Sequence, residues 1–204
     1  MNTSTRSAGR TVWVALRTMV LATLVLGVAY TFAITGLAQL LAPAQAHGSI
    51  VRASDGEPVG SALLGQSFLD ADGAPLPQYF QSRPSAAGHG YDGGASSGSN
   101  LGPNNPDLVA AIRERRAQIA AFNGVAPDAV PADAVTSSGS GLDPHISPAY
   151  AVIQLERVAE ARGLSADEVR RIVADHTTGR DLGYLGEARV NVVELNAALD
   201  GMGD

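Results

Sequence analysis

The residues from Val20 to Leu41 form an unbroken stretch without a charged side chain, built mainly from Leu, Val, Ala, Ile, Thr and Gly. As an α-helix this stretch would be about 33 Å long, against about 30 Å for the hydrocarbon core of a bilayer. A single segment inside a bilayer has to be helical, because only a helix satisfies its own backbone polar groups there. We therefore predict a tail at residues 1–17, a transmembrane helix at 18–41 and one extracytoplasmic domain at 42–204.

The orientation of this helix follows from the arginines around it. Arg6, Arg10 and Arg17 precede the apolar stretch, and only Arg52 follows it closely. Because positively charged residues stay on the cytoplasmic side, the tail is predicted to be cytoplasmic and the domain to lie outside. A cleaved signal peptide is the alternative, with residues 44–46 (AQA) as the cleavage motif. The apolar stretch exceeds the 7–15 residues or so of a signal peptide, which favours a retained anchor.

The composition excludes several classes of chemistry. The sequence contains no Cys and no Lys, which excludes disulfides, cysteine-based zinc sites, P-loops and lysine Schiff bases. The part after the apolar stretch has 11 Arg against 20 acidic residues, a net charge of −9. Such a surface disfavours nucleic acid as a partner. We predict neither a metal site nor a directly bound cofactor.

The remaining sequence predicts an α+β domain, with strands first and helices mostly later. Strands are predicted at 49–52 and 59–66 around an Asp-Gly turn, at Val135, and at 189–193. Helices are predicted from Asn105-Pro106 to Gly124, from Pro148 to Arg162, from the capping box at 165–168 to a point before Gly179, and at 194–199.

Residues 77–106 are rich in Gly, Ser and Pro. A flexible linker is one interpretation of such a composition. A linker would not normally carry Tyr79, Phe80 and Tyr91, whose burial would fix the segment to the domain. We therefore favour an ordered, irregular loop, in which Arg83 and Asn100 together satisfy buried backbone groups.

Candidate catalytic groups are few. The four histidines lack HExxH spacing and an accompanying carboxylate cluster. Asp143, His145 and Ser147 alternate along one short segment, which suits capping of the following helix better than a catalytic triad. The Gly- and Ser-rich segments at 98–100 and 138–141 could cradle an anion, but turn formation is the preferred interpretation.

Several short segments, in one order along the chain, resemble the C subunit of the Kdp high-affinity potassium-transporting ATPase. These are YFQSRPSA (79–86), SSGSNLGP (96–103), SGSGLDPHISP (138–148), RVAEARGLS (157–165) and LGYLGEARVNVVELNAALD (182–200). Parts of the apolar stretch, AY (29–30) and TGLAQ (35–39), are similar as well. Five dispersed segments in one order are far more specific than any single Gly-rich loop.

The resemblance implies an accessory subunit of an ATP-driven potassium uptake complex in the bacterial plasma membrane, required for its assembly and activity. The implied partners are a channel-like potassium-binding subunit, a P-type ATPase subunit and a small membrane subunit. The family is described as a catalytic chaperone that raises the ATP affinity of the ATPase subunit, without a catalytic centre of its own. ATP, if bound, would be bound together with that subunit.

The resemblance also marks positions expected to serve structure or partner contact. They are Arg83, Pro84, Ser85, Ser99, Asn100, Asp143, His145, Ser147, Gln154, Arg157, Arg162, Asn191 and Asn196. Departures exist: Thr31 stands where the family usually has Pro, which puts a kink there in question, and Glu156 replaces another Pro. The alternatives are a secreted hydrolase and an outer-surface binding module, each with a cleaved signal peptide.

Overall fold

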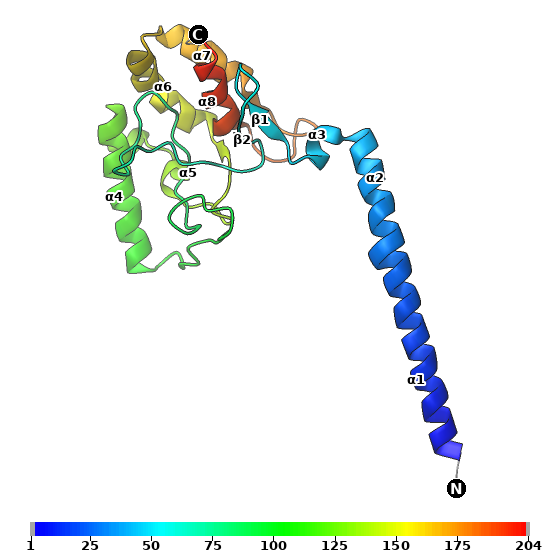
Figure 1. Cartoon of the computed structure of the whole chain (residues 1–204). Helices are drawn as coiled ribbons and strands as arrows, with labels where there is room; N and C mark the ends of the chain where they lie inside the picture. The colour runs from blue at the N-terminus through cyan, green and yellow to red at the C-terminus, as the bar shows by residue number, and fades with distance from the viewer. Residues whose placement is uncertain (1–2, 203–204) are drawn as a thin grey trace. The chain divides into compact units, whose positions relative to one another are not determined.

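The computed structural model describes residues 3–202 and divides into two compact units, with the boundary between Ser49 and Ile50. The first unit is helical and the second combines helices with short strands (Figure 1). This confirms the predicted fold class, an apolar N-terminal helix followed by a globular α+β part.

The first unit is one continuous helix with a short helical turn after it. The helix comprises α1 (Thr3–Ala22), a π-helical stretch (Thr23–Tyr30) and α2 (Thr31–Leu41), and α3 (Pro43–Ala46) follows. Residues Ala8–Leu41 are the one helix in the described range long and apolar enough to cross a membrane, and none of this segment is buried within the structure. The helix thus begins well inside the tail predicted at 1–17, whose first two residues lie outside the described range.

Thr31 does not interrupt this helix. Its φ and ψ of −59° and −48° are helical, and its hydroxyl donates a hydrogen bond to the Leu26 carbonyl at 3.4 Å. The backbone leaves helical geometry only at Ala42, where φ and ψ are −143° and 61°. Pro43 follows, and a residue before proline is biased away from helical geometry.

The strands of the second unit form two small antiparallel sheets. β1 (Ile50–Arg52) pairs with β2 (Pro58–Ser61) across the predicted turn, where Gly56 has a φ of 88°. β2 ends earlier than predicted. The second sheet has the order β3-β5-β4, from β3 (His145–Ile146), β4 (Thr177–Thr178) and β5 (Arg189–Asn191). β3 and β4 were not predicted, because two residues carry no detectable periodicity.

Three of the four longer helices follow predicted capping signals, and the cap of the fourth, Asn191, was not predicted. α4 (Pro106–Asn123), α6 (Pro148–Arg162), α7 (Ala166–Asp175) and α8 (Val192–Asp200) each begin after a capping Asn or Ser. Ser165 and Glu168 form the expected capping box of α7, and Gly124 and Gly163 end α4 and α6 in the left-handed conformation.

Two further elements differ from the prediction. Val135 lies in a helical turn, α5 (Ala132–Val135), which follows the 3-10 turn Pro127–Ala129, and not in a strand. An isolated β-branched residue without a neighbouring strand to pair with does not make a strand. Val192 and Val193 belong to α8 and not to the preceding strand, because the Asn191 side chain accepts hydrogen bonds from the amides of residues 193 and 194.

The hydrophobic core lies where α6 meets α4, α7 and the second sheet, with α8 against α7 (Figure 1). Its fully buried large side chains include Leu155, Val169, Leu195 and Leu199, and Phe80 from the long loop joins them. Phe80 has no exposed surface, so the loop beginning at residue 77 is fixed to the domain as predicted.

Candidate functional site

The segment at residues 77–83, here called the central segment, is held by side chains instead of neighbouring strands. The amide of Phe80 donates to the Asn196 side-chain oxygen, and the Asn196 amide nitrogen donates to the Phe80 carbonyl, both at 2.9 Å. Gln154 makes the same pair of bonds with the next residue, Gln81, at 2.7 and 3.2 Å. The side chains of Asn196 and Gln154 therefore satisfy the backbone groups of Phe80 and Gln81, as a neighbouring strand would do in a sheet.

Arg157 fixes the start of the central segment. Its guanidinium donates to the carbonyls of Pro77 and Tyr79, and to the side chain of Asn123 at 2.9 Å. It also stacks over the Phe122 ring at 4.3 Å. Burial lowers the pKa of Arg157 to about 10, so the group remains charged at neutral pH.

Arg162, one and a half turns further along α6, fixes the same segment from the other side. Its guanidinium donates to the Gln78 carbonyl at 2.7 Å and to the Leu199 carbonyl at 3.0 Å. It also forms an ion pair with Asp200 at 2.7 Å, and its Cζ atom lies 5.0 Å from the centre of the Tyr79 ring. The structure thus brings four of the family-signature positions, Gln154, Arg157, Arg162 and Asn196, onto one short segment.

Asn191, another family-signature position, bonds a different part of the domain. Its side-chain nitrogen donates to the Ala62 carbonyl at 2.8 Å, while its oxygen caps α8. The residue therefore ties the first hairpin to the second sheet.

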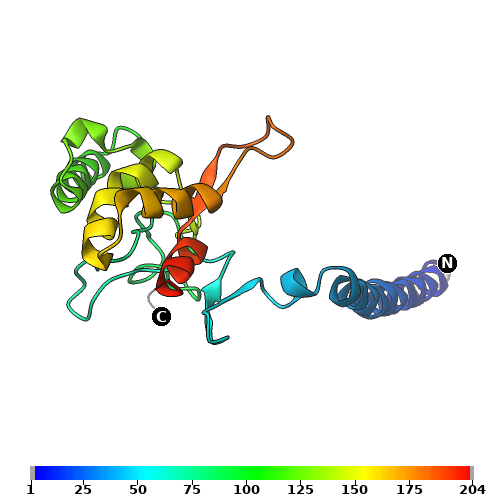
Figure 2. The ribbon, with the colours of Figure 1, turned by 90° about the horizontal axis from the view of Figure 1, so that it is seen from above.

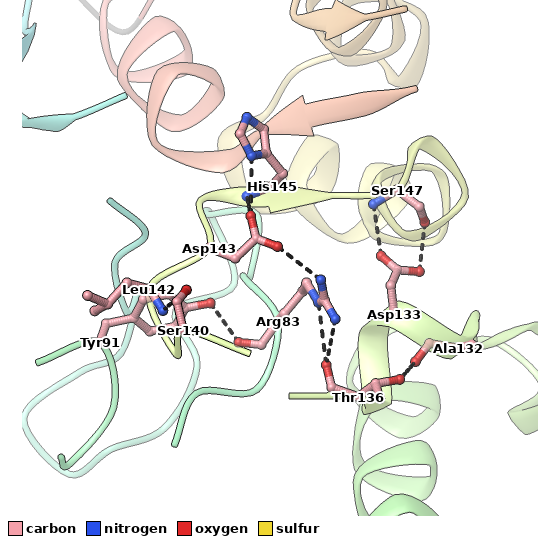
Figure 3. Close-up of polar contacts among 10 residues, drawn as sticks. All are labelled: Arg83, Tyr91, Ala132, Asp133, Thr136, Ser140, Leu142, Asp143, His145 and Ser147. Atoms are coloured by element: carbon pink, nitrogen blue, oxygen red, sulfur yellow. Dashed lines mark hydrogen bonds and ion pairs between the residues drawn. The ribbon is translucent and has the colours of Figure 1, made fainter. Parts of the chain in front are cut away.

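A polar cavity of about 280 Å³ lies near the other end of the central segment (Figure 3). Its charged and hydroxyl side chains are Arg83, Asp133, Asp143, His145, Ser147, Glu187 and Arg189. Arg83 donates to the Asp143 carboxylate at 2.9 Å, and the other Asp143 oxygen lies 3.2 Å from His145 Nδ1. The Asp143 carboxylate therefore bridges the side chains of Arg83 and His145.

Ser147 is bonded to other residues. Its backbone amide and its hydroxyl each donate to the Asp133 carboxylate at 2.8 Å (Figure 3). Its hydroxyl also accepts from the Tyr150 amide at 3.0 Å. The hydroxyl therefore caps α6 as predicted, and its partner is Asp133 and not His145. Asp143, His145 and Ser147 do not have the connections of a catalytic triad.

The expectation that Arg83 and Asn100 hold the long loop together is wrong for Asn100. Besides Asp143, Arg83 bonds the Thr136 carbonyl through Nε and Nη2, at 3.4 and 3.2 Å. Asn100 is exposed, with a φ of 52°, and joins none of these contacts. Asn tolerates the left-handed conformation better than most residues, so Asn100 serves the turn itself.

The two Gly- and Ser-rich segments pack on each other. The Ser97 amide donates to the Ser140 carbonyl at 2.9 Å, and the Ser85 hydroxyl donates to the Gly141 carbonyl at 2.6 Å. A Cβ on Gly141, whose φ is 69°, would lie 2.6 Å from the Ser97 carbonyl oxygen. These bonds favour the turn interpretation over an anion cradle. Pro84 accepts from the Ser138 amide at the same junction, whereas Ser99 is exposed.

No cluster of three or more His, Asp or Glu side chains able to hold a metal ion occurs within residues 3–202. Of the three carboxylates in the polar cavity, Asp133 and Asp143 are already bonded to protein donors. These two carboxylates therefore serve the polar network of the domain itself.

Replacing Asp143 by Asn is expected to make stability less dependent on acid pH. Burial raises the pKa of the Asp143 carboxyl, but hydrogen bonds from His145 and the charge of Arg83 outweigh it, so that its pKa lies below the ordinary 3.8. A depressed pKa stabilises the folded state above about pH 4, and this contribution disappears as the pH falls through the folded-state pKa.

Unfolding of the full chain in detergent should show Asp143→Asn about 1–2 kcal/mol less stable than wild type at pH 7, with the difference shrinking near pH 3. Asp72→Asn, at an exposed turn, is the control and should show no comparable change. A difference for Asp143→Asn that is the same at both pH values would contradict the prediction.

A globular α+β unit preceded by a single apolar helix of membrane-spanning length fits the class of membrane-anchored subunits. A family model described as "K+-transporting ATPase, c chain" matches residues 12–201. The chain belongs to this family, the KdpC subunits of the potassium-transporting ATPase.

Similar proteins carry the same description. A "Potassium-transporting ATPase KdpC subunit" from Kineococcus radiotolerans is 55% identical over 181 residues, covering 89% of this chain and 88% of the relative. Relatives from Sorangium cellulosum and Mycobacterium bovis, described in the same words, are 57% and 49% identical over 178 and 187 residues. They cover 86% and 91% of this chain, and 89% and 95% of their own lengths.

Proposed function

We propose that the chain is an accessory subunit that the ATP-driven potassium uptake complex needs for assembly and activity, and that it has no catalytic centre of its own. The observation that carries the proposal is the family match across residues 12–201, which includes the apolar helix. The bonding of Ser147 to Asp133, away from His145, supports a non-catalytic role for the polar cavity.

We further propose a single-pass topology, with residues 1–17 in the cytoplasm, 18–41 in the membrane and 42–204 outside. Its support is the concentration of Arg before the apolar segment. The proposed partners are a channel-like potassium-binding subunit, a P-type ATPase subunit and a small membrane subunit. The family's role as a catalytic chaperone would then act on the ATPase subunit.

With this topology, an effect on ATP affinity has to be indirect. ATP is a polyanion, and the domain has a net charge of −9 without a single Lys. Long-range electrostatics therefore oppose ATP at this surface. We propose that the chain raises the ATP affinity of its partner through contacts made by the helix and the domain.

The absence of Cys allows a direct test of the topology. Ala8→Cys, in the predicted tail, and Ala117→Cys, on the exposed side of α4, are exposed reporter positions. An impermeant maleimide should label position 117 in intact spheroplasts and position 8 only after permeabilisation, while the cysteine-free chain stays unlabelled. The reverse pattern would place the domain in the cytoplasm and would defeat the proposal.

The same cells allow a test of the function. Deleting the chain should abolish growth at low potassium, and the full chain should restore it. In detergent, the ATPase partner subunit should bind ATP more tightly with the chain than without it, and the chain alone should not bind ATP saturably. Growth and ATP affinity that do not depend on the chain would contradict the proposed role.

A further inference from the structure

The connection between β4 and β5 exposes a small group of apolar side chains. Figure 2 shows this hairpin, drawn in orange, projecting from the helices of the globular unit. At its end, Leu182, Tyr184 and Leu185 expose 81%, 69% and 49% of their surface. We call residues 182–185 the apolar tip. Single exposed apolar residues are common on proteins, but three within four residues of a projecting turn suggest an interaction site.

The apolar tip has a defined backbone conformation. Asp181 and Leu185 exchange two backbone hydrogen bonds, each of 2.9 Å, and the Gly183 amide donates to the Arg180 carbonyl at 3.1 Å. An ion pair of 3.7 Å between Asp181 and Arg189 braces the base of the hairpin. The turn is therefore preorganised, which reduces the entropy lost when it binds a partner.

Leu182 adopts a backbone conformation that its side chain disfavours. Its φ is 54°, in the left-handed region where a bulky residue is a genuine outlier. Gly or Asn would fit this position with less strain, and the exposed Leu182 side chain makes little contact that could offset the strain within the domain. Strained residues of this kind cluster at ligand-binding and switch regions. The strain and the exposure point independently to a contact outside the chain.

We infer that the apolar tip inserts into an apolar pocket on another protein subunit of the same complex. This inference rests on the proposed function, which places the chain in a multisubunit assembly. Charge favours a protein over the lipid surface: Asp181 and Glu187 balance Arg180 and Arg189 around the tip, and the domain as a whole is acidic. Contact with an anionic bilayer needs an excess of basic residues beside the apolar ones, and the charges around this hairpin cancel.

A photo-crosslinker identifies what the tip touches. p-Benzoylphenylalanine at position 184, in the complex co-expressed with its other subunits, should crosslink to one of those subunits. The same group at position 152 should give no such product, because Val152 is comparably exposed, at 56%, but lies on α6. Products formed only with lipid, or only with a second copy of this chain, would overturn the inference.

Substitutions separate this inference from the proposed function. In detergent, the double variant Leu182→Ser/Tyr184→Ser should bind the other subunits at least about tenfold more weakly than wild type, while Val152→Ser should not differ. Leu182→Gly should also weaken binding, yet leave the unfolding temperature of the full chain unchanged or raised, because it relieves the strain. Equal binding by all variants would defeat the inference alone, whereas a wild-type chain that recovers no other subunit would defeat the proposed function.

Discussion

Replacing Arg157 by Ala is expected to destabilise the globular domain by about 3–5 kcal/mol. The substitution removes the donors for the carbonyls of Pro77 and Tyr79 and the partner of Asn123, and partly buried groups left without a partner cost about 1–3 kcal/mol each. Denaturant unfolding of the full chain in detergent measures this loss.

Two variants sharpen the Arg157 test. Arg113→Ala, on the exposed side of α4, should change stability by less than about 0.5 kcal/mol. Arg157→Lys keeps the positive charge but not the planar fork, so most of the loss should remain. A loss below about 1 kcal/mol for Arg157→Ala would mean that the guanidinium does not hold the central segment.

Replacing Asn196 by Leu, which is similar in volume, is expected to cost about 2–4 kcal/mol. Asn196 is 1% exposed, and it satisfies both the amide and the carbonyl of Phe80, which itself is fully buried. An apolar side chain in its place leaves two buried backbone groups without partners. The free energy of unfolding again measures the effect, with Asn104→Leu at an exposed position as control.

Combining Asn196→Leu with Gln154→Leu tests whether the two amides act on one segment. They hold the neighbouring residues Phe80 and Gln81, so losing the first should free the segment and make the second loss smaller. The double variant is therefore expected to be less destabilised than the sum of the single variants. Strict additivity would show that the two pairs of bonds are independent.

The sequence predicted those parts of the fold that depend on local chemistry. The apolar stretch predicted the long helix, and Asn105, Ser147 and Ser165 marked helix starts to the residue, because capping is a bond between neighbours in the chain. Attachment of the long loop to the domain was predicted from Tyr79, Phe80 and Tyr91, of which Phe80 is fully buried. The two-residue strands β3 and β4 were missed, since pairing with β5 alone defines them.

The bonds from Asn196 and Gln154 to the central segment could not be predicted from the sequence, although the sequence contains a signal for them. Asn196 and Phe80 are 116 positions apart, and Gln154 and Gln81 are 73 apart, so no local pattern connects them. The signal is an amide side chain at a core-facing helix position: Gln154 lies among inward-facing apolar residues of α6, and Asn196 among those of α8. A buried amide needs partners, but the helix alone does not tell which backbone it will bond.

The partners of Arg83 illustrate the same limit. The sequence correctly suggested that its guanidinium would bond backbone carbonyls, but it gave Asn100 a shared role and did not indicate Thr136 or Asp143. Thr136 and Asp143 approach Arg83 only because α5 and β3 bring their segment back to the long loop. Resemblance to a family marked Arg83 and Asp143 as positions of interest without showing their contacts.

The side-chain hydrogen bonds that hold the central segment also impose an order of events during synthesis. Residues 77–83 leave the ribosome long before α6 and α8, so the backbone of Phe80 has to wait 116 further positions for its partner Asn196. Ribosomes add about 5–20 residues per second, so the segment stays uncovered for several seconds. A chain truncated before residue 192 lacks Asn196 and cannot close around Phe80, so it would leave the central segment accessible to proteases.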